Sequence, residues 1–108
     1  MKKWFLCLLL VSLVGCAKNE IKLENSGTSP WQHLEIRAGG HVFEIDQFEG
    51  GATERFRFSS RAEDGGLFRG SLNGQEFKAQ FGYFTPNLAS QLEIVLSDDG
   101  TIMVQEGP

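Results

Sequence analysis

Residues 68–83 read FRGSLNGQEFKAQFGY, and this stretch decides the fold class. At its centre lies Asn73-Gly74, two residues that tolerate the positive φ of a tight primed turn. After the turn, apolar residues recur at every second position from Phe77 to Tyr83, which is the period of a strand with one buried face. The stretch therefore predicts a β-hairpin whose second strand directs those side chains, Tyr83 included, toward a core.

The same period of two continues on both sides of the hairpin, and no stretch keeps helical spacing over three turns. Six further pairs of apolar residues share a face: Ile21 with Leu23, Leu34 with Ile36, Phe43 with Ile45, Phe56 with Phe58, Leu92 with Ile94, and Ile102 with Val104. Turn residues separate these runs at Asn25-Ser26-Gly27, Gly39-Gly40, Gly50-Gly51, Asp64-Gly65-Gly66 and Asp98-Asp99-Gly100. Seven or eight short strands are expected.

These strands predict an all-β domain over residues 20–108, arranged as a small antiparallel β-sandwich. Immunoglobulin-like and transthyretin-like sandwiches both remain open, although the Cys and Trp spacing of true immunoglobulin domains is missing. A small barrel is the alternative. The 108 residues suffice for one core and one domain.

The acidic charge argues against one class of partner. The formal net charge is −4 and includes Lys2 and Lys3, so a chain without residues 1–15 carries about −6 on its side chains. The remaining basic residues are spread singly among carboxylates and form no run. Because nucleic acids are polyanions, no nucleic-acid partner is expected.

The N-terminus has the pattern of a secretion signal. Lys2 and Lys3 provide a positive start, and about eleven residues, almost all apolar, follow from Trp4 to Val14. A helix of that length spans about 16 Å, against about 30 Å for the hydrocarbon core of a bilayer. The run is therefore too short for a stable membrane span and is interpreted as a removable leader, with a buried N-terminal helix as the alternative.

The run ends in Leu13-Val14-Gly15-Cys16, which resembles the lipobox of bacterial lipoproteins. The resemblance implies that residues 1–15 are a lipoprotein signal peptide, that Cys16 carries a diacylglycerol and an acyl chain, and that residues 16–19 are a lipidated N-terminus and short tether. Two or three acyl chains hold a protein stably on a membrane, whereas one does so only marginally. Cys16 is the expected lipidation site, with a free secretory cysteine as the alternative.

The same resemblance implies a place in the cell. In families with outer-membrane sorting, an aspartate after the lipidated cysteine marks retention in the inner membrane, and here that position is Ala17. If the organism is Gram-negative, the expected location is therefore the periplasmic face of the outer membrane. The order of turns also resembles small uncharacterised envelope lipoproteins of the β-sandwich type, a likeness that implies no activity.

Catalytic and metal-binding motifs are not found in the sequence. His33 and His41 have no ligand spacing, and after cleavage Cys16 is the one remaining cysteine and is committed to lipid. Glu63-Asp64 and Asp98-Asp99 are paired carboxylates beside glycines, where acidic residues serve turn geometry. We expect no catalytic residue, no metal and no cofactor other than the covalent lipid.

Three aromatic residues are candidate partner-binding residues. Tyr83 and Phe84 are adjacent, so in a strand they point to opposite faces and one of them should be exposed. Trp31 follows Pro30 where a strand is expected to start. An exposed aromatic side chain beside a turn can anchor a partner protein or a glycan. The alternative for Trp31 and Phe84 is that they close the ends of the sandwich.

The sequence favours a non-enzymatic, lipid-anchored envelope protein that binds another protein or supports an envelope assembly through a sheet edge or an aromatic loop. An inhibitor or immunity lipoprotein acting against a wall-degrading enzyme or a toxin is the alternative. A small enzyme is disfavoured, because a two-layer sandwich of this size rarely holds a pocket with convergent titratable groups.

Overall fold

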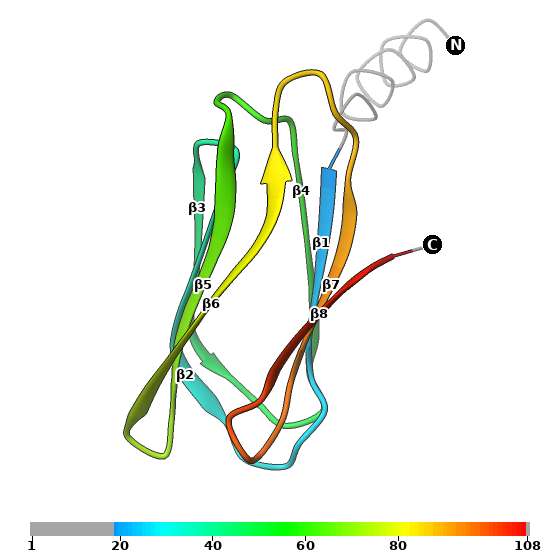
Figure 1. Ribbon diagram of the computed structural model, residues 1–108. Helices are drawn as coiled ribbons and strands as arrows, with labels where there is room; N and C mark the ends of the chain where they lie inside the picture. The colour runs from blue at the N-terminus through cyan, green and yellow to red at the C-terminus, as the bar shows by residue number, and fades with distance from the viewer. Residues whose placement is uncertain (1–18, 108) are drawn as a thin grey trace, which may run out of the picture.

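The computed structural model describes residues 19–107, which form a sandwich of two four-stranded β-sheets (Figure 1). Its strands are β1 (Asn19–Asn25), β2 (Trp31–Ala38), β3 (His41–Phe48), β4 (Thr53–Phe58), β5 (Asp64–Leu72), β6 (Gln75–Phe84), β7 (Gln91–Leu96) and β8 (Ile102–Glu106). The predicted all-β sandwich of seven or eight strands is confirmed. The predicted leader, the lipobox and Cys16 lie outside the described residues. Between residues 19 and 107 no helix is long and apolar enough to cross a membrane.

The two sheets have the strand orders β4-β1-β7-β8 and β3-β2-β5-β6. This order places β1 and β2 in different sheets, whereas an immunoglobulin-like sandwich keeps its first two strands in one sheet. The immunoglobulin-like alternative is therefore wrong. The transthyretin-like form of the sandwich stays a prediction.

One pairing departs from the predicted antiparallel arrangement. β1 lies between β4 and β7, with Leu23 opposite Glu54 in the antiparallel pair and opposite Ile94 in the parallel pair. A short hairpin cannot join two parallel neighbours, and here the whole of β2 to β6 separates β1 from β7. Turn signals in the sequence therefore carry no information about the relative direction of these two strands.

The predicted hairpin turn at Asn73-Gly74 is confirmed. Its two residues have φ values of 53° and 82°, and they connect β5 to β6. Gly39-Gly40 has nearly the same geometry, with φ values of 57° and 82°, and connects β2 to β3. Both turns place two consecutive residues at positive φ, which matches the right-handed twist of the strands that they join.

The predicted turn at Asp64-Gly65-Gly66 is wrong, because β5 already begins at Asp64. Gly66 serves packing instead of turning: a Cβ there would lie 2.6 Å from the ring of Phe81, so the aromatic ring occupies the space of a side chain. The Asp64 carboxylate accepts a hydrogen bond of 2.8 Å from the N–H of Gly39. This residue therefore stabilises a neighbouring turn without being part of one.

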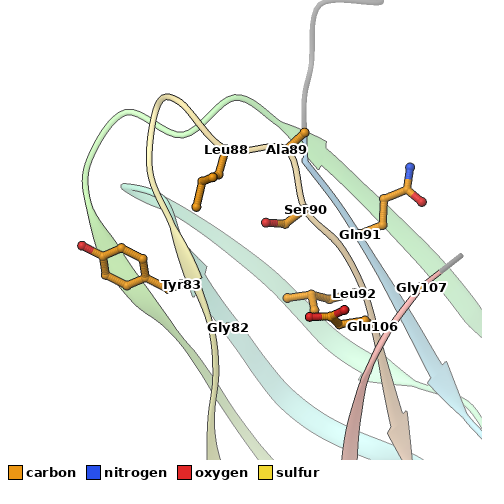
Figure 2. Close-up of a pocket in the computed structure, with 9 residues that line it drawn as sticks. All are labelled: Gly82, Tyr83, Leu88, Ala89, Ser90, Gln91, Leu92, Glu106 and Gly107. Carbon is orange, nitrogen blue, oxygen red and sulfur yellow. The ribbon is translucent and has the colours of Figure 1, made fainter.

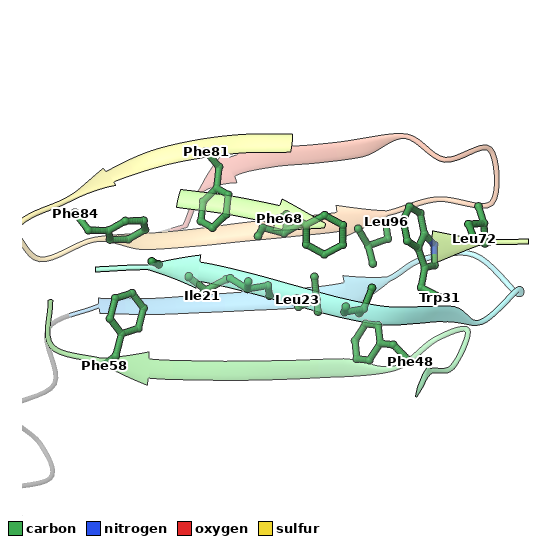
Figure 3. Packing of buried hydrophobic residues seen from close by; sticks show 14 residues of the cluster. Ile21, Leu23, Trp31, Phe48, Phe58, Phe68, Leu72, Phe81, Phe84 and Leu96 are labelled. Atoms are coloured by element: carbon green, nitrogen blue, oxygen red, sulfur yellow. The ribbon is translucent and has the colours of Figure 1, made fainter. Parts of the chain in front are cut away.

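The core fills the space between the sheets (Figure 3). Its buried apolar residues are Ile21, Leu23, Trp31, Leu34, Ile36, Ala38, Phe48, Phe58, Phe68, Leu72, Phe81, Phe84, Ile94 and Leu96. Each large side chain among them contributes about 1.5–3 kcal/mol to folding. Every inward position that the period of two predicts is buried or half-buried, with Tyr83 as the exception.

A β-bulge in β2 turns Trp31 into the core. The register between β2 and β5 shifts by one residue between Gln32 and Glu35. The extra residue is His33, whose φ is 55°. This insertion changes the alternation, so that Trp31 and Leu34 both face inward although they lie three positions apart.

A second bulge, in β6, decides which of two adjacent aromatic residues is buried. The register between β5 and β6 shifts near Gly82, whose φ is 61°. After the extra residue the alternation restarts, so that Phe81 and Phe84 face inward and Tyr83 faces outward. The predicted core position of Tyr83 is therefore wrong.

Candidate functional site

The three predicted partner-binding aromatic residues differ in burial. Trp31 is 0% exposed and Phe84 is 1% exposed, so both belong to the core. Their predicted role in binding is wrong, and the bulges at His33 and Gly82 are the physical reason. Tyr83 is 54% exposed, which confirms that one member of the Tyr83-Phe84 pair faces solvent.

The surroundings of Trp31 and Phe84 show that both are packing residues. The ring centroid of Trp31 lies 6.0 Å from that of Phe68 and 5.6 Å from that of Phe77. Its buried Nε1–H has no hydrogen-bond partner among the described residues, and the large buried area of the ring offsets that cost. Phe84 packs on Phe58 with a centroid distance of 5.5 Å and closes one end of the core.

A groove of about 600 Å³ lies beside Tyr83, between the end of β6 and the strands β7 and β8 (Figure 2). Leu88, Ser90, Leu92 and Glu106 line it with their side chains. Leu88 extends from the β6–β7 loop toward Leu92 and Glu106, whereas the ring of Tyr83 points away from them (Figure 2). The groove therefore combines two apolar side chains with one carboxylate.

The groove opens on one side of the sandwich, while aromatic residues close the other. On the closed side, Phe43 of β3 packs on Phe56 and Phe58 of β4 with centroid distances of 4.8 and 5.6 Å. On the open side, β6 approaches β7 closely at one point, where a Cβ on Gly82 would lie 2.9 Å from Cδ1 of Leu92. The groove lies beside this close approach, and β8 borders it.

The outer edge of β8 presents free main-chain groups next to the groove. The N–H of Gly107 donates to the carbonyl of Gln91 at 2.7 Å, and the N–H of Ser97 donates to the carbonyl of Thr101 at 3.1 Å. Because hydrogen-bonded pairs alternate in an antiparallel ladder, the even-numbered residues of β8 direct their N–H and C=O groups away from β7. Within residues 19–107 no strand pairs with this edge.

The edge of β8 is also the least charged of the four sheet edges. β3, β4 and β6 each carry at least two charged residues, and such residues discourage pairing with another chain. β8 carries Glu106 at its end and is otherwise apolar or neutral. Ile102 and Val104 pack half-buried against the core, and Met103 is 52% exposed on the outer face. This edge is therefore the best suited to accept an added strand.

Each described histidine has one polar neighbour, and the ring of His41 also lies against the rings of Phe43 and Phe58. Nδ1 of His33 lies 3.6 Å from Oδ1 of Asp46, and both side chains are exposed. Nε2 of His41 lies 2.7 Å from the carbonyl oxygen of Ser59. In the part of the chain that the structure describes, no three His, Cys, Asp or Glu side chains are grouped to hold a metal ion.

In the Asp98-Asp99 turn, Asp99 has the predicted role in turn geometry, because its carboxylate accepts from the N–H of Thr101 at 3.0 Å, whereas Asp98 binds a neighbouring loop. Asp98 accepts hydrogen bonds of 3.0 Å from the N–H groups of Thr28 and Ser29. These donors, that of Ser29 foremost, lower the pKa of Asp98. The hydroxyl and N–H of Thr101 likewise lower the pKa of Asp99. Hydrogen bonds thus favour the ionised form of both carboxylates, from a neighbouring loop for Asp98 and from within the same turn for Asp99.

A second depression of about 600 Å³ lies on the outer face of the β3-β2-β5-β6 sheet. Arg69 lies among carboxylates there, including Glu35, Glu44 and Glu76. Its Nε is buried and has no hydrogen-bond partner among the described residues. The depression adjoins no free strand edge with the low charge of β8, so it is the weaker candidate for a binding site.

The groove lies at the end of the sandwich where β1 begins. The N–H of Ser90 donates to Oδ1 of Asn19 at 3.0 Å, and the N–H of Glu20 donates to the carbonyl of Ser90 at 2.9 Å. Asn19 is buried and is the first described residue. The groove therefore adjoins Asn19, where β1 begins.

Sequence reasoning missed Leu88, Leu92 and Glu106 as lining residues of a groove. One signal was available: the segment Thr85–Ser90 is an uncharged loop that contains a leucine, and an isolated leucine in a turn has no strand face on which to be buried. Glu106 continues the inward positions of Ile102 and Val104, which also is readable from the period of two. The sequence did not show that the loop of residues 85–90 lies close to β7 and β8.

Comparison with known proteins supports the fold alone. An NMR structure of a protein from Eubacterium rectale is similar to this chain, with a TM-score of 0.57 and 14% sequence identity. The similarity covers 85% of this chain and 90% of that protein. No protein-family model matches the sequence, and no curated protein matches it either. The shared architecture is therefore a β-sandwich, and the likeness brings no activity to this chain.

Proposed function

We propose that this chain is a lipid-anchored cell-envelope protein that binds a partner protein, without catalysis, along the free edge of β8 and in the adjoining groove. The observation that carries the proposal is the edge of β8 itself. Except for Glu106 its residues are apolar or neutral, it directs main-chain hydrogen-bonding groups outward, and it borders a groove. Strand addition to such an edge is a common mode of peptide recognition.

The lipid anchor is proposed from the likeness of Leu13-Val14-Gly15-Cys16 to a lipobox. A diacylglycerol and an acyl chain on Cys16 provide the two or more chains that stable membrane attachment needs. In a Gram-negative organism, Ala17 favours the periplasmic face of the outer membrane. The proposed partner is therefore a protein of the cell envelope.

The groove adds chemical selectivity to the proposed binding. A strand added to β8 hydrogen-bonds to the outward groups of Val104 and Glu106 and places one side chain beside Leu88 and Leu92. Glu106 has no ion-pair partner among the described residues. A partner with an acidic residue at this place is repelled, whereas a lysine or arginine pairs with the carboxylate. A second copy of this acidic chain is disfavoured for the same reason.

Photo-crosslinking of the full-length protein in its native membrane tests the binding proposal. A benzophenone amino acid replaces Met103 on β8 in one protein and Val42 on β3 in the other, and both positions are 52% exposed. We expect a discrete protein adduct from position 103 and none from position 42. An adduct of equal yield from both positions, or from neither, contradicts the proposed edge.

A proline at Val104 makes the test specific for strand addition. Val104→Pro removes an N–H that points away from β7, so it blocks an added strand while the β7–β8 ladder keeps its hydrogen bonds. Val104→Ala is the matched control, because it also shortens the side chain but keeps the N–H. We expect the adduct yield from position 103 to fall at least about fivefold in Val104→Pro and to persist in Val104→Ala.

A further inference from the structure

We infer that the end of the sandwich where β1 begins rests on the bilayer, so that the groove and the edge of β8 are held at the membrane surface. This end, called the Asn19 end, consists of the Gly39-Gly40 turn, residues 59–63 and residues 85–90. The opposite end, called the Asn73 end, consists of residues 26–30, 49–52, 73–74 and 97–101. The inference rests on the proposed lipid anchor and adds an orientation to it.

Hydrogen bonds fix which segments form the Asn19 end. Asn19 is joined to residues 85–90 through Ser90, and its Nδ2 donates to the carbonyl of Phe58 at 3.3 Å, directly before residues 59–63. The N–H of Arg61 donates to the carbonyl of Gly39 at 2.7 Å. The three loops and the first residue of β1 therefore lie together, as Figure 1 also shows.

The length of the tether limits how far this end can lie from the lipid. Three peptide units connect Cys16 to Asn19, and a fully extended chain covers at most about 11 Å over that length. Because Asn19 is buried, pairs with Phe58 of β4 and accepts a hydrogen bond from Ser90, it cannot unwind from the domain without breaking both contacts. The anchor therefore brings the Asn19 end to the depth of the lipid headgroups and leaves the Asn73 end distant.

The charges of the two ends favour the same orientation. The loops of the Asn73 end carry Glu49, Asp98 and Asp99 and no lysine or arginine. The loops of the Asn19 end carry one charge of each sign, on Arg61 and Glu63, and Glu106 at the end of β8 adds one negative charge. Anionic lipids therefore repel the Asn73 end, whose loops carry three carboxylates, more strongly than the Asn19 end. Charge and tether length thus select the same end independently.

The side chains at the Asn19 end suit an interface between lipid and water. Leu88 is 49% exposed in the uncharged loop of residues 85–90. Tyr83 is exposed next to this loop and donates a hydrogen bond of 3.4 Å from its hydroxyl to Glu63. Tyrosine is enriched at headgroup depth because its ring is apolar and its hydroxyl is polar. A partner that occupies the groove is therefore bound at the membrane surface.

Fluorescence quenching of the lipidated protein tests this orientation. The variants are made in a Cys7→Ser background. The introduced cysteine then carries the one free thiol, because the thiol of Cys16 is bonded to the diacylglycerol. An environment-sensitive dye is attached through Asn87→Cys at the Asn19 end or, as the matched control, through Gln75→Cys beside the Asn73 end, both at exposed positions. The proteins are reconstituted in vesicles of phosphatidylethanolamine and phosphatidylglycerol, and aqueous iodide is the quencher.

We expect iodide quenching at position 87 to be at least about threefold weaker than at position 75, because headgroups shield the first dye. In detergent-free buffer, the Cys16→Ala versions should show no such difference. The mass of each protein is measured in parallel. Equal quenching at both positions in a protein whose mass includes the lipid overturns the orientation and leaves the anchor intact. A mass without lipid overturns the anchor itself, and with it the basis of the inference.

Discussion

Asp98 holds Thr28: its carboxylate accepts hydrogen bonds of 3.0 Å from both the N–H and the hydroxyl of that residue. The contact joins the loop after β1 to the turn between β7 and β8. A Cβ on Gly27 would lie 2.0 Å from Oδ1 of Asp98, so the loop can approach the carboxylate only with glycine at this position. The two segments therefore depend on each other for their conformations.

The first prediction concerns the pH dependence of stability. The N–H groups of Ser29 and Thr28 lower the pKa of Asp98, and Arg57 lowers that of Glu20. A carboxyl group with a lowered pKa in the folded state stabilises the fold above its unfolded pKa of about 4, and this stabilisation is lost as the pH falls through the folded pKa. We expect the urea midpoint to be nearly constant from about pH 7 to 5 and to fall below about pH 4.

Asp98→Asn tests the contribution of this one carboxylate. The variant should have a lower urea midpoint than the wild type at neutral pH and a smaller loss of stability on acidification. Glu76→Gln removes an exposed carboxylate of β6 and controls for the change in net charge. Parallel pH profiles for wild type and Asp98→Asn would show that the donors of residues 28 and 29 do not matter to stability.

The second prediction concerns the buried amide of Asn19. Asn19→Ala leaves the carbonyl of Phe58 and the N–H of Ser90 without their side-chain partner, and each unsatisfied buried group costs about 1–3 kcal/mol of unfolding free energy. Equilibrium unfolding in urea measures the loss. Asn87→Ala, an exposed change in the β6–β7 loop, should stay within about 0.5 kcal/mol of wild type. Equal effects would contradict a structural role for Asn19.

The third prediction separates the packing of Trp31 from its polar atom. Trp31→Ala should cost about 3–5 kcal/mol, because the side chain is fully buried. Trp31→Phe should cost clearly less, since the Nε1–H makes no hydrogen bond within the described residues. Urea unfolding gives both values. Native emission at short wavelength, shifting to longer wavelength on unfolding, is expected from Trp31, and long-wavelength native emission would contradict its burial.

The fourth prediction concerns the bulge in β2. His33 has a φ of 55°, a conformation that histidine and asparagine tolerate better than β-branched residues. His33→Val should therefore destabilise the protein by about 1–2 kcal/mol, whereas His33→Asn should be nearly neutral. The exposed contact of His33 with Asp46 adds little. If both variants lose the same free energy, that contact matters and the backbone conformation does not.

The sequence predicted the features that local residue patterns encode, namely tight turns and strands with one buried face. Asn73-Gly74 has the backbone freedom that its turn requires, and the alternation around it reports one buried face. The pairing of β1 with β7 was not predictable, because it joins segments about seventy residues apart whose direction no turn defines. The exclusion of the immunoglobulin-like sandwich likewise needed the structure, because it rests on the placement of β1 and β2 in different sheets.

The candidate site was harder to predict, because the two bulges reassign its aromatic residues. A period of two gives Tyr83 an inward position, and the extra residue near Gly82 reverses it. His33 does the same for Trp31 through a conformation that its residue type does not require. Glu106 was readable as an inward position at a strand end, yet the loop that carries Leu88 had to be placed in space before a groove could be recognised.

The central position of β1 determines when its sheet can form. β1 emerges first from the ribosome or a translocation channel, but its neighbour β7 follows only after most of the chain. The sheet therefore closes late, and a fold dominated by such distant pairings forms slowly, in milliseconds to seconds. In the lipid-anchored envelope protein proposed above, which would cross a membrane unfolded, this delay keeps the nascent polypeptide competent for export, through the same topology that holds Asn19 in the finished domain.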